Sequence, residues 1–148
     1  MGKIYAAYAS NINIPQMRYR VGRNAYLLGK AWLRDFELCF RGDRAKTAVA
    51  TIAPKDGSAV PVLLWWINEE AERLLNCYEG VPTHYRQETV RLEYGGFWLD
   101  EVMVYEMVPG KPLNSPSEQY YQTIVEGYLM QRMPLQILEE ARDRSTKK

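Results

Sequence analysis

The alternation of apolar and polar residues predicts a chain that is rich in β-strands and that ends in helices. Strands are expected at residues 4–8, 34–41, 46–52, 60–67, 85–94 and 97–108. The alternation is clearest over residues 34–41, where Leu38 and Phe40 share one face, as is typical of a half-buried strand. The segment 60–67 is apolar throughout, so we expect a strand that is covered on both faces.

Turn-forming residues separate these strands. Pro-Lys-Asp-Gly-Ser at residues 54–58 predicts a turn between two strands. The Gly-Gly pair at residues 95–96 predicts a hairpin, because its tight turn requires positive φ angles. Residues 24–33 are too densely apolar to show a period, so their structure stays open.

Two helices are expected in the first part of the chain, at residues 14–19 and 69–78. Asn13 and Asn68 precede them, and a short polar side chain at this position accepts a hydrogen bond from an unpaired N–H group of the first turn. Gly80 suits the left-handed conformation that commonly ends a helix, so we expect the second helix to stop there.

Two more helices are expected to close the chain. Ser-Pro-Ser-Glu at residues 115–118 matches a capping box and predicts a helix start. Pro134 is expected to begin the last helix, with Leu138 turned inward, and the charged residues 142–148 are expected to fray. With its hairpins and closing helices, the chain (residues 1–148) is predicted to be one α+β domain, an antiparallel-rich sheet or small barrel packed by helices.

Composition narrows the classes of function. The chain has 148 residues and a formal net charge of +1, so we expect a single domain that is not drawn electrostatically to nucleic acid or to an anionic membrane. No apolar run approaches the length of a membrane span, and no secretion signal begins the sequence. Cys39 and Cys77 form no disulfide framework, and with His84 they give no usual zinc spacing. These features predict a reduced, cytoplasmic protein.

The loop after the first expected strand is one candidate site. Ser10, Asn11 and Asn13 offer short donors and acceptors, and the start of the next helix leaves backbone N–H groups unpaired. Such a geometry can bind an anion. The alternative is a plain turn that joins a strand to a helix.

Glu79 is the other candidate. It is expected at the C-terminal end of a helix, where the helix dipole disfavours a negative charge and raises the pKa of a carboxyl group. A carboxyl group with a raised pKa suits a general base near neutral pH. The alternative is an ordinary solvated glutamate. His84 has no recognisable catalytic partner, and we interpret it as a structural or surface residue.

Four segments carry a resemblance to a known family. Residues 5–12 are similar to a Tyr-Gly-Ser-Asn-Leu signature, and residues 78–82 (Tyr-Glu-Gly-Val-Pro) resemble a catalytic Glu-Gly turn. Residues 102–105 and 116–120 resemble a later strand and the start of a closing helix. The family is the gamma-glutamylcyclotransferase-like family, which includes AIG2-like and BtrG-like proteins. The resemblance implies a small mixed, mostly antiparallel β-barrel flanked by helices, with a cavity at one end.

The resemblance also implies a reaction. The α-amine of a γ-glutamyl substrate would attack the γ-carbonyl of the same molecule, which releases 5-oxoproline and an amino acid, peptide or amine. Glu79 would be the general acid and base. The substrate would be held by Tyr8, Ala9, Ser10, Asn11, Ile12 and Tyr120. No metal or cofactor is implied, because the nucleophile belongs to the substrate.

Ala9 departs from the family signature, which has glycine at this position. An alanine at positive φ would be strained, and its methyl group would crowd a substrate carboxylate. Three hypotheses therefore stay open. The protein is an enzyme, a non-catalytic binding protein for a small anionic or nucleotide-like metabolite, or an interaction protein with a vestigial pocket.

The extent of the pocket and the assembly are also open. Trp65, Trp66, Trp98 and Tyr121 either extend the pocket or pack in the core. No sequence feature identifies the leaving group. The sequence is compatible with a monomer or a homodimer that binds a small molecule.

Overall fold

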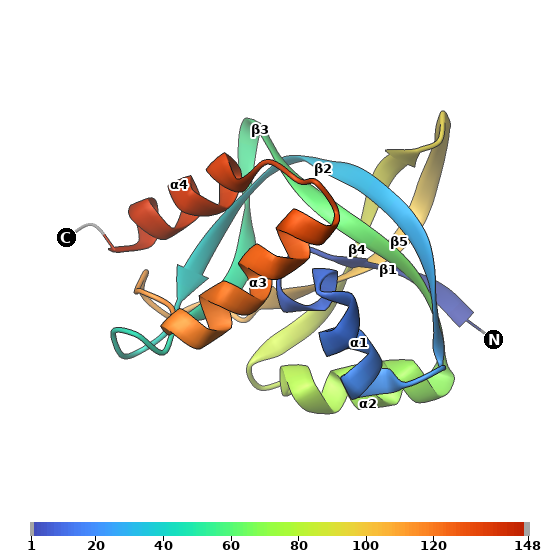
Figure 1. The fold of residues 1–148 in the computed structure, drawn as a ribbon, viewed down its shortest axis with the longest axis horizontal. Coiled ribbons are helices and arrows are strands. Elements are labelled where there is room, and N and C mark those ends of the chain that lie inside the picture. The colour runs from blue at the N-terminus through green and yellow to red at the C-terminus, as the bar shows by residue number, and fades with distance from the viewer. Residues whose placement is uncertain (1, 147–148) are drawn as a thin grey trace.

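Five β-strands close into a barrel in the computed structural model, which describes residues 2–146. They are β1 (Gly2–Ala7), β2 (Ala25–Arg41), β3 (Val49–Asn68), β4 (Tyr85–Tyr94) and β5 (Phe97–Met107). Their order around the barrel is β1-β3-β2-β4-β5 (Figure 1). Paired strands are antiparallel except β1 and β5, which are parallel. The predicted α+β fold with a mostly antiparallel barrel is confirmed.

The prediction that a turn at residues 54–58 separates two strands is wrong. β3 continues through it, so the strands expected at residues 46–52 and 60–67 belong to one element. The turn residues instead form a bulge opposite Asp35, where the register between β2 and β3 shifts. The Asp35 Oδ1 accepts a hydrogen bond from the N–H of Gly57 at 3.0 Å. Because pairing resumes on both sides, the turn-forming residues interrupt the ladder without ending the strand.

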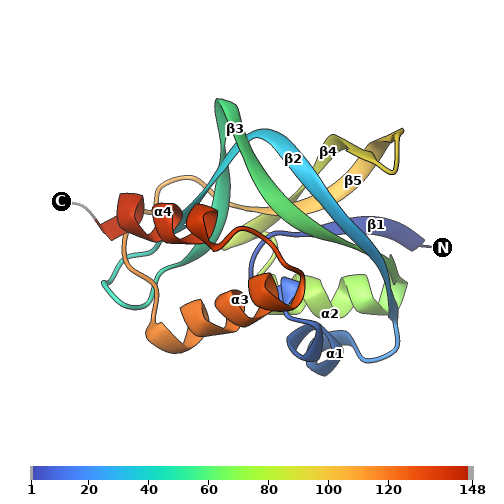
Figure 2. The ribbon, with the colours of Figure 1, turned by 45° about the horizontal axis from the view of Figure 1, so that its top comes forward.

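Helices cover one side and one end of the barrel (Figures 1 and 2). They are α1 (Ile14–Val21), α2 (Glu69–Glu79), α3 (Glu118–Met130) and α4 (Leu135–Thr146). α1 and α2 lie side by side at one end, and α3 lies between α1 and α4. The apolar core includes Leu33, Leu38, Phe40, Val62, Leu64, Trp65, Val102, Val104, Ile124 and Leu138.

The predicted caps of the first two helices are confirmed. Asn13 caps α1, and its Oδ1 accepts a hydrogen bond from the N–H of Gln16 at 3.2 Å. Asn68 caps α2 in the same way, with the N–H of Ala71 as donor at 2.9 Å. Residues 24–33, which the sequence left open, run from the turn after α1 into the first half of β2.

The start of α3 differs from the predicted capping box. Ser117 is the N-cap, and its Oγ accepts a hydrogen bond from the N–H of Tyr120 at 3.1 Å. The Oγ of Ser115 accepts instead from the N–H of Lys46 at 2.8 Å. The first serine of the motif therefore fastens the loop after β2, and the helix begins at Glu118.

α4 follows Pro134 as predicted. The fraying predicted for residues 142–148 is wrong for residues 142–146, which belong to this helix. Ser145 is buried, and its Oγ accepts a hydrogen bond from the N–H of Phe40 at 2.9 Å. The same hydroxyl donates to the carbonyl of Ala141 at 2.7 Å. The bond with Phe40 fastens the last turn of α4 to β2. Residues 147–148 lie outside the described residues.

Candidate active site

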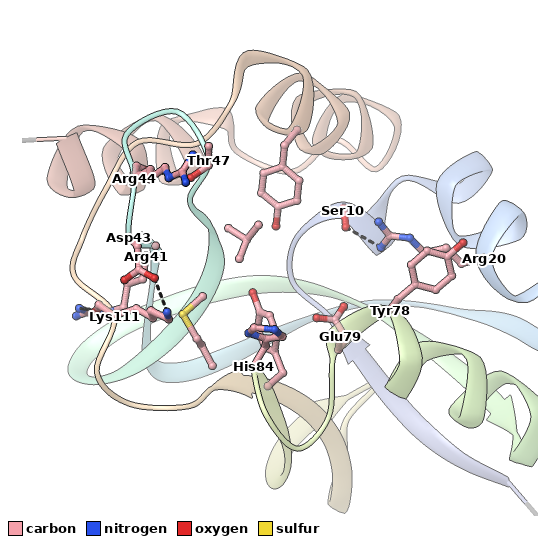
Figure 3. A pocket seen from close by; sticks show the side chains of 15 residues that line it. Ser10, Arg20, Arg41, Asp43, Arg44, Thr47, Tyr78, Glu79, His84 and Lys111 are labelled. Atoms are coloured by element: carbon pink, nitrogen blue, oxygen red, sulfur yellow. Dashed lines mark hydrogen bonds and ion pairs between the residues drawn. The ribbon is translucent and has the colours of Figure 1, made fainter.

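A cavity of about 580 Å³, the main cavity, opens where α1, α2, α3 and the loop after β2 meet. Its volume lies in the range of sites for small organic molecules, roughly 300–1,000 Å³. Figure 3 shows that its charged residues gather at two ends. Ser10, Arg20, Tyr78 and Glu79 lie at one end, His84 lies in the middle, and Arg41, Asp43, Arg44 and Lys111 lie at the other.

The end of α2 places Glu79 at the main cavity. Gly80 follows with a left-handed conformation (φ 65°, ψ 42°), and the N–H of Val81 donates to the carbonyl of Asn76 at 3.0 Å. A Cβ atom at position 80 would lie 2.7 Å from the His84 ring. Glycine therefore suits the left-handed turn, and a larger residue would also require the His84 side chain to move. The predicted end of α2 at Gly80 is confirmed.

The carboxyl group of Glu79 is poised to exchange a proton. Burial raises its pKa to about 7, and the nearby Arg20 guanidinium opposes this rise. The direction agrees with the sequence prediction, although burial is the main cause. Within residues 2–146 this carboxyl group makes no hydrogen bond or ion pair. It is therefore free to accept or donate a proton to a molecule in the main cavity near neutral pH.

The loop after β1 forms a 3₁₀ turn, η1 (Ser10–Ile12). The N–H of Ile12 donates to the carbonyl of Ala9 at 3.0 Å, and the N–H of Asn13 donates to the carbonyl of Ser10 at 3.1 Å. Because Ser10 and Asn11 begin the turn, their N–H groups have no partner within it. The loop thus offers backbone donors next to the main cavity.

The structure gathers six of the seven residues predicted for the site. Ser10, Glu79 and Tyr120 line the main cavity. The same three residues also line an adjacent inner pocket of about 30 Å³, together with Tyr8, Ala9 and Asn11. Ile12 is the exception, because its side chain is buried in the core.

Ala9 does not have the positive φ angle that favours glycine. Its φ angle is −137°, outside the left-handed region that favours glycine, so the conformational penalty considered from the sequence does not arise. Ala9 lines the inner pocket. The replacement of glycine by alanine therefore acts on the space beside Glu79.

Arg20 belongs to the site although the sequence analysis did not select it. Its Nη1 donates to Ser10 Oγ at 3.0 Å and to Asn11 Oδ1 at 2.8 Å. Its guanidinium carbon lies 4.8 Å from the centre of the Tyr78 ring, and its Nε is buried without a hydrogen-bond partner among the described residues. Its spacing in the sequence could have indicated this position. Arg20 follows the buried Met17 by three residues and therefore lies on the same side of α1.

Buried tyrosines surround the inner pocket. Tyr8 and Tyr85 donate their hydroxyl groups to the carbonyls of Tyr105 and Ala50. The hydroxyl of Tyr120 accepts a hydrogen bond from the N–H of Ala50 at 3.1 Å. Burial raises the pKa of the Tyr120 hydroxyl, so it stays protonated and can donate.

The other aromatic candidates do not extend the pocket. Trp65 is buried, and its Nε1 donates to the carbonyl of Asn11 at 3.1 Å, which supports the loop from the core side. Tyr121 is also buried and packs against Phe40. Trp66 is half-buried and Trp98 is exposed, and neither lines the main cavity or the inner pocket.

The described part of the chain holds no group of three or more His, Cys, Asp or Glu side chains that could bind a metal ion. Among its helices, none is both long enough and apolar enough to cross a membrane.

Comparisons with known proteins agree with this geometry. Residues 7–129 match the family model described as gamma-glutamyl cyclotransferase, AIG2-like. The chain belongs to this family. The match includes the loop after β1, Glu79 and Tyr120, so the site lies within the part that defines the family. A comparison with curated proteins found no match.

Solved structures resemble the whole barrel. A structure described as a gamma-glutamyl cyclotransferase is 26% identical with a TM-score of 0.83, and the match covers 95% of this chain and 86% of that one. An uncharacterized protein from Homo sapiens is 27% identical with a TM-score of 0.82 and the same coverage of 95% and 86%. YkqA from Bacillus subtilis shares the fold at 20% identity and a TM-score of 0.79, with 97% of this chain and 54% of that chain covered.

Proposed function

We propose that this protein is a gamma-glutamylcyclotransferase that releases 5-oxoproline from a γ-glutamyl amine, amino acid or peptide. The observation that carries the proposal is the carboxyl group of Glu79. It lines the main cavity, lacks a bonding partner among the described residues, and has a pKa raised by burial to about 7. A group of this kind can accept a proton and return it within one reaction cycle.

The reaction needs one proton shuttle. In its ionised form Glu79 accepts a proton from the α-amine while the amine nitrogen bonds to the γ-carbonyl carbon. The bond between this carbon and the leaving nitrogen then breaks, and Glu79 gives the proton to the leaving nitrogen. The products are the five-membered lactam 5-oxoproline and a free amine. No co-reactant is needed, and proximity within the substrate supplies much of the rate.

Neighbouring groups fit the remaining tasks. The α-carboxylate of the substrate lies on the same carbon as the attacking amine, so it must bind close to Glu79. The guanidinium of Arg20 and the N–H group of Ser10 can serve as donors at this end of the main cavity, and the N–H group of Asn11 can do so at the inner pocket. The hydroxyl of Tyr120 can donate to the γ-carbonyl oxygen as negative charge develops there.

The test is 5-oxoproline release by the purified protein from a panel of γ-glutamyl amines, amino acids and peptides. Glu79→Gln removes the proton shuttle, and we expect a loss of kcat of about 10²–10⁴ with the fold retained. Glu70→Gln is the matched control, because Glu70 lies on the same helix but is exposed and pairs with Arg73. Wild-type rates in Glu79→Gln would contradict the proposal.

One observation favours a second function. The inner pocket holds only about 30 Å³, and Ala9 lines it, so a substrate carboxylate has little room there. In this alternative the main cavity binds a small anionic or nucleotide-like metabolite without turnover. A folded protein that releases no 5-oxoproline, yet carries a metabolite detected by native mass spectrometry, would support it.

A further inference from the structure

The end of the main cavity away from Glu79 carries an excess of positive charge. Arg41, Arg44 and Lys111 line it with a single carboxylate, that of Asp43. We call these four residues the cationic end, and Figure 3 shows them opposite Glu79. The other charged groups of this cavity, Arg20 and Glu79, lie at the reacting end.

Hydrogen bonds between two loops hold the cationic end together. The Arg41 Nη1 donates to the carbonyl of Lys111 at 2.9 Å, and the N–H of Gly42 donates to the carbonyl of Pro112 at 2.9 Å. The N–H of Ala48 also donates to the carbonyl of Ser115 at 3.1 Å. The loop after β2 is thus bonded to the loop before α3, and these bonds bring charges distant in sequence to one place.

Most of this charge is not neutralised within the described residues. The Lys111 Nζ lies 2.5 Å from Asp43 Oδ2, and this is the ion pair of the cationic end. The Arg41 guanidinium bonds to a carbonyl and contacts the thiol of Cys39, but no carboxylate. The Arg44 side chain has no hydrogen bond or ion pair in residues 2–146. Two guanidinium groups therefore remain available to an anion.

We propose that the cationic end binds a carboxylate on the leaving group of the substrate. The favoured substrates are then γ-glutamyl amino acids or peptides, in preference to γ-glutamyl amines. This inference rests on the proposed cyclotransfer reaction, in which the glutamyl part lies beside Glu79 and the leaving nitrogen points along the main cavity. A guanidinium group matches a carboxylate in charge and geometry, whereas a neutral or cationic leaving group gains nothing from this excess of positive charge.

Three substrates that differ only at one position test the inference. They are γ-glutamyl-alanine, γ-glutamyl-alanine amide and γ-glutamyl-ethylamine, and the measurement is kcat/KM for 5-oxoproline release. We expect roughly tenfold or greater preference for the acid over both neutral compounds, because charge-assisted hydrogen bonds are lost without the carboxylate. Equal values for all three would overturn the inference while leaving the cyclotransfer reaction in place.

Variants connect this preference to the cationic end. Arg44→Gln is expected to lower the ratio of kcat/KM for the acid to that for the amide by severalfold, since Arg44 has no structural partner to lose. Lys55→Gln removes the same charge from an exposed bulge of β3 outside the main cavity, and it should leave the ratio unchanged. If Arg44→Gln leaves this ratio unchanged, as Lys55→Gln should, then Arg44 does not bind the carboxylate of the leaving group.

Measurements of binding affinity test the carboxylate site independently of the reaction. Calorimetric titration of the Glu79→Gln protein with γ-glutamyl-alanine and γ-glutamyl-ethylamine measures Kd without turnover. We expect the acid to bind roughly tenfold more tightly, with a smaller difference at high salt because surface charges are screened. A preference for the acid without any turnover by the wild-type protein would contradict the reaction and support the carboxylate site. Equal Kd values would overturn the site.

Discussion

Arg20 and Glu79 line the same cavity, yet within the described residues they form no ion pair. The Arg20 guanidinium is bonded instead to the loop after β1, through Ser10 Oγ at 3.0 Å and Asn11 Oδ1 at 2.8 Å. It lies near enough to oppose the rise in the pKa of Glu79 without neutralising its carboxyl group. The cavity therefore holds a fixed positive charge beside an exchangeable proton, which is the arrangement that the proposed reaction of a γ-glutamyl substrate requires.

The pH dependence of kcat/KM follows from this relationship. Glu79 must be ionised to accept a proton, so we expect kcat/KM for 5-oxoproline release to fall as the pH drops below about 7. Arg20→Gln removes the charge that lowers the pKa of Glu79, so the acidic limb should move to higher pH. Arg20→Lys keeps the charge and should leave this limb near its wild-type position. An acidic limb that stays in place in Arg20→Gln would show that Arg20 does not act on the base.

The raised pKa of Glu79 also predicts how stability changes with pH. The folded protein keeps this proton up to about pH 7, whereas the unfolded chain releases it near 4.5, so Glu79 lowers the free energy of unfolding as the pH rises between these values. We expect Glu79→Gln to be more stable than the wild type by about 1–3 kcal/mol at pH 8 and to show no gain at pH 4. Urea unfolding at the two pH values measures this, with Glu101→Gln, at an exposed position of β5, as control. Equal stabilities at pH 8 would show that the Glu79 carboxyl group is solvated in the folded protein.

Features set by local chemistry were predictable from the sequence. Asn13 and Asn68 cap helices, and Gly80 ends one, because each acts on backbone groups a few residues away. The turn at residues 54–58 was misplaced because pairing between β2 and β3 continues past it. The end of α4 was misjudged because a buried hydrogen bond holds it in place, in which the N–H of Phe40, distant in sequence, donates to Ser145 Oγ.

The same division applies to the candidate site. Glu79 could be selected because its position at a helix end is a local property. Spacing places Arg20 on the buried side of α1, but its contact with the site and the cationic end could not be predicted. The reason is that α1, the end of β2 and the loop that carries Lys111 meet only in the closed barrel. The φ angle of Ala9 was likewise undetermined by the sequence, and its negative value changes what the substitution means.

Ala9→Gly tests whether the methyl group at this position crowds the ligand. Since φ is −137°, glycine relieves no positive-φ strain, and we expect the free energy of unfolding to change by no more than about 1 kcal/mol. The inner pocket gains space, so we expect a severalfold lower KM for γ-glutamyl substrates with little change in kcat. Ala53→Gly, in β3 and away from both pockets, should leave KM unchanged. A higher KM in Ala9→Gly would mean that the methyl group contacts the ligand favourably.

Gly127 allows α3 to touch the loop that precedes α1. A Cβ atom there would lie 2.8 Å from the backbone nitrogen of Asn13 and 3.0 Å from the carbonyl carbon of Ile12. Because both are backbone atoms, no change of side-chain rotamer can relieve the contact, and Gly127→Ala must push α3 and the loop apart. We expect a loss of about 1–3 kcal/mol in the free energy of unfolding.

The same displacement should weaken substrate binding, because the loop carries Ser10 and Asn11 at the main cavity and the inner pocket. We therefore expect Gly127→Ala to raise KM for γ-glutamyl substrates, and urea unfolding and steady-state kinetics on one preparation measure both effects. Gln122→Ala, at an exposed position of α3, should change neither quantity. Lower stability with an unchanged KM would mean that α3 moves while the loop keeps its geometry. In that case α3 does not position the substrate.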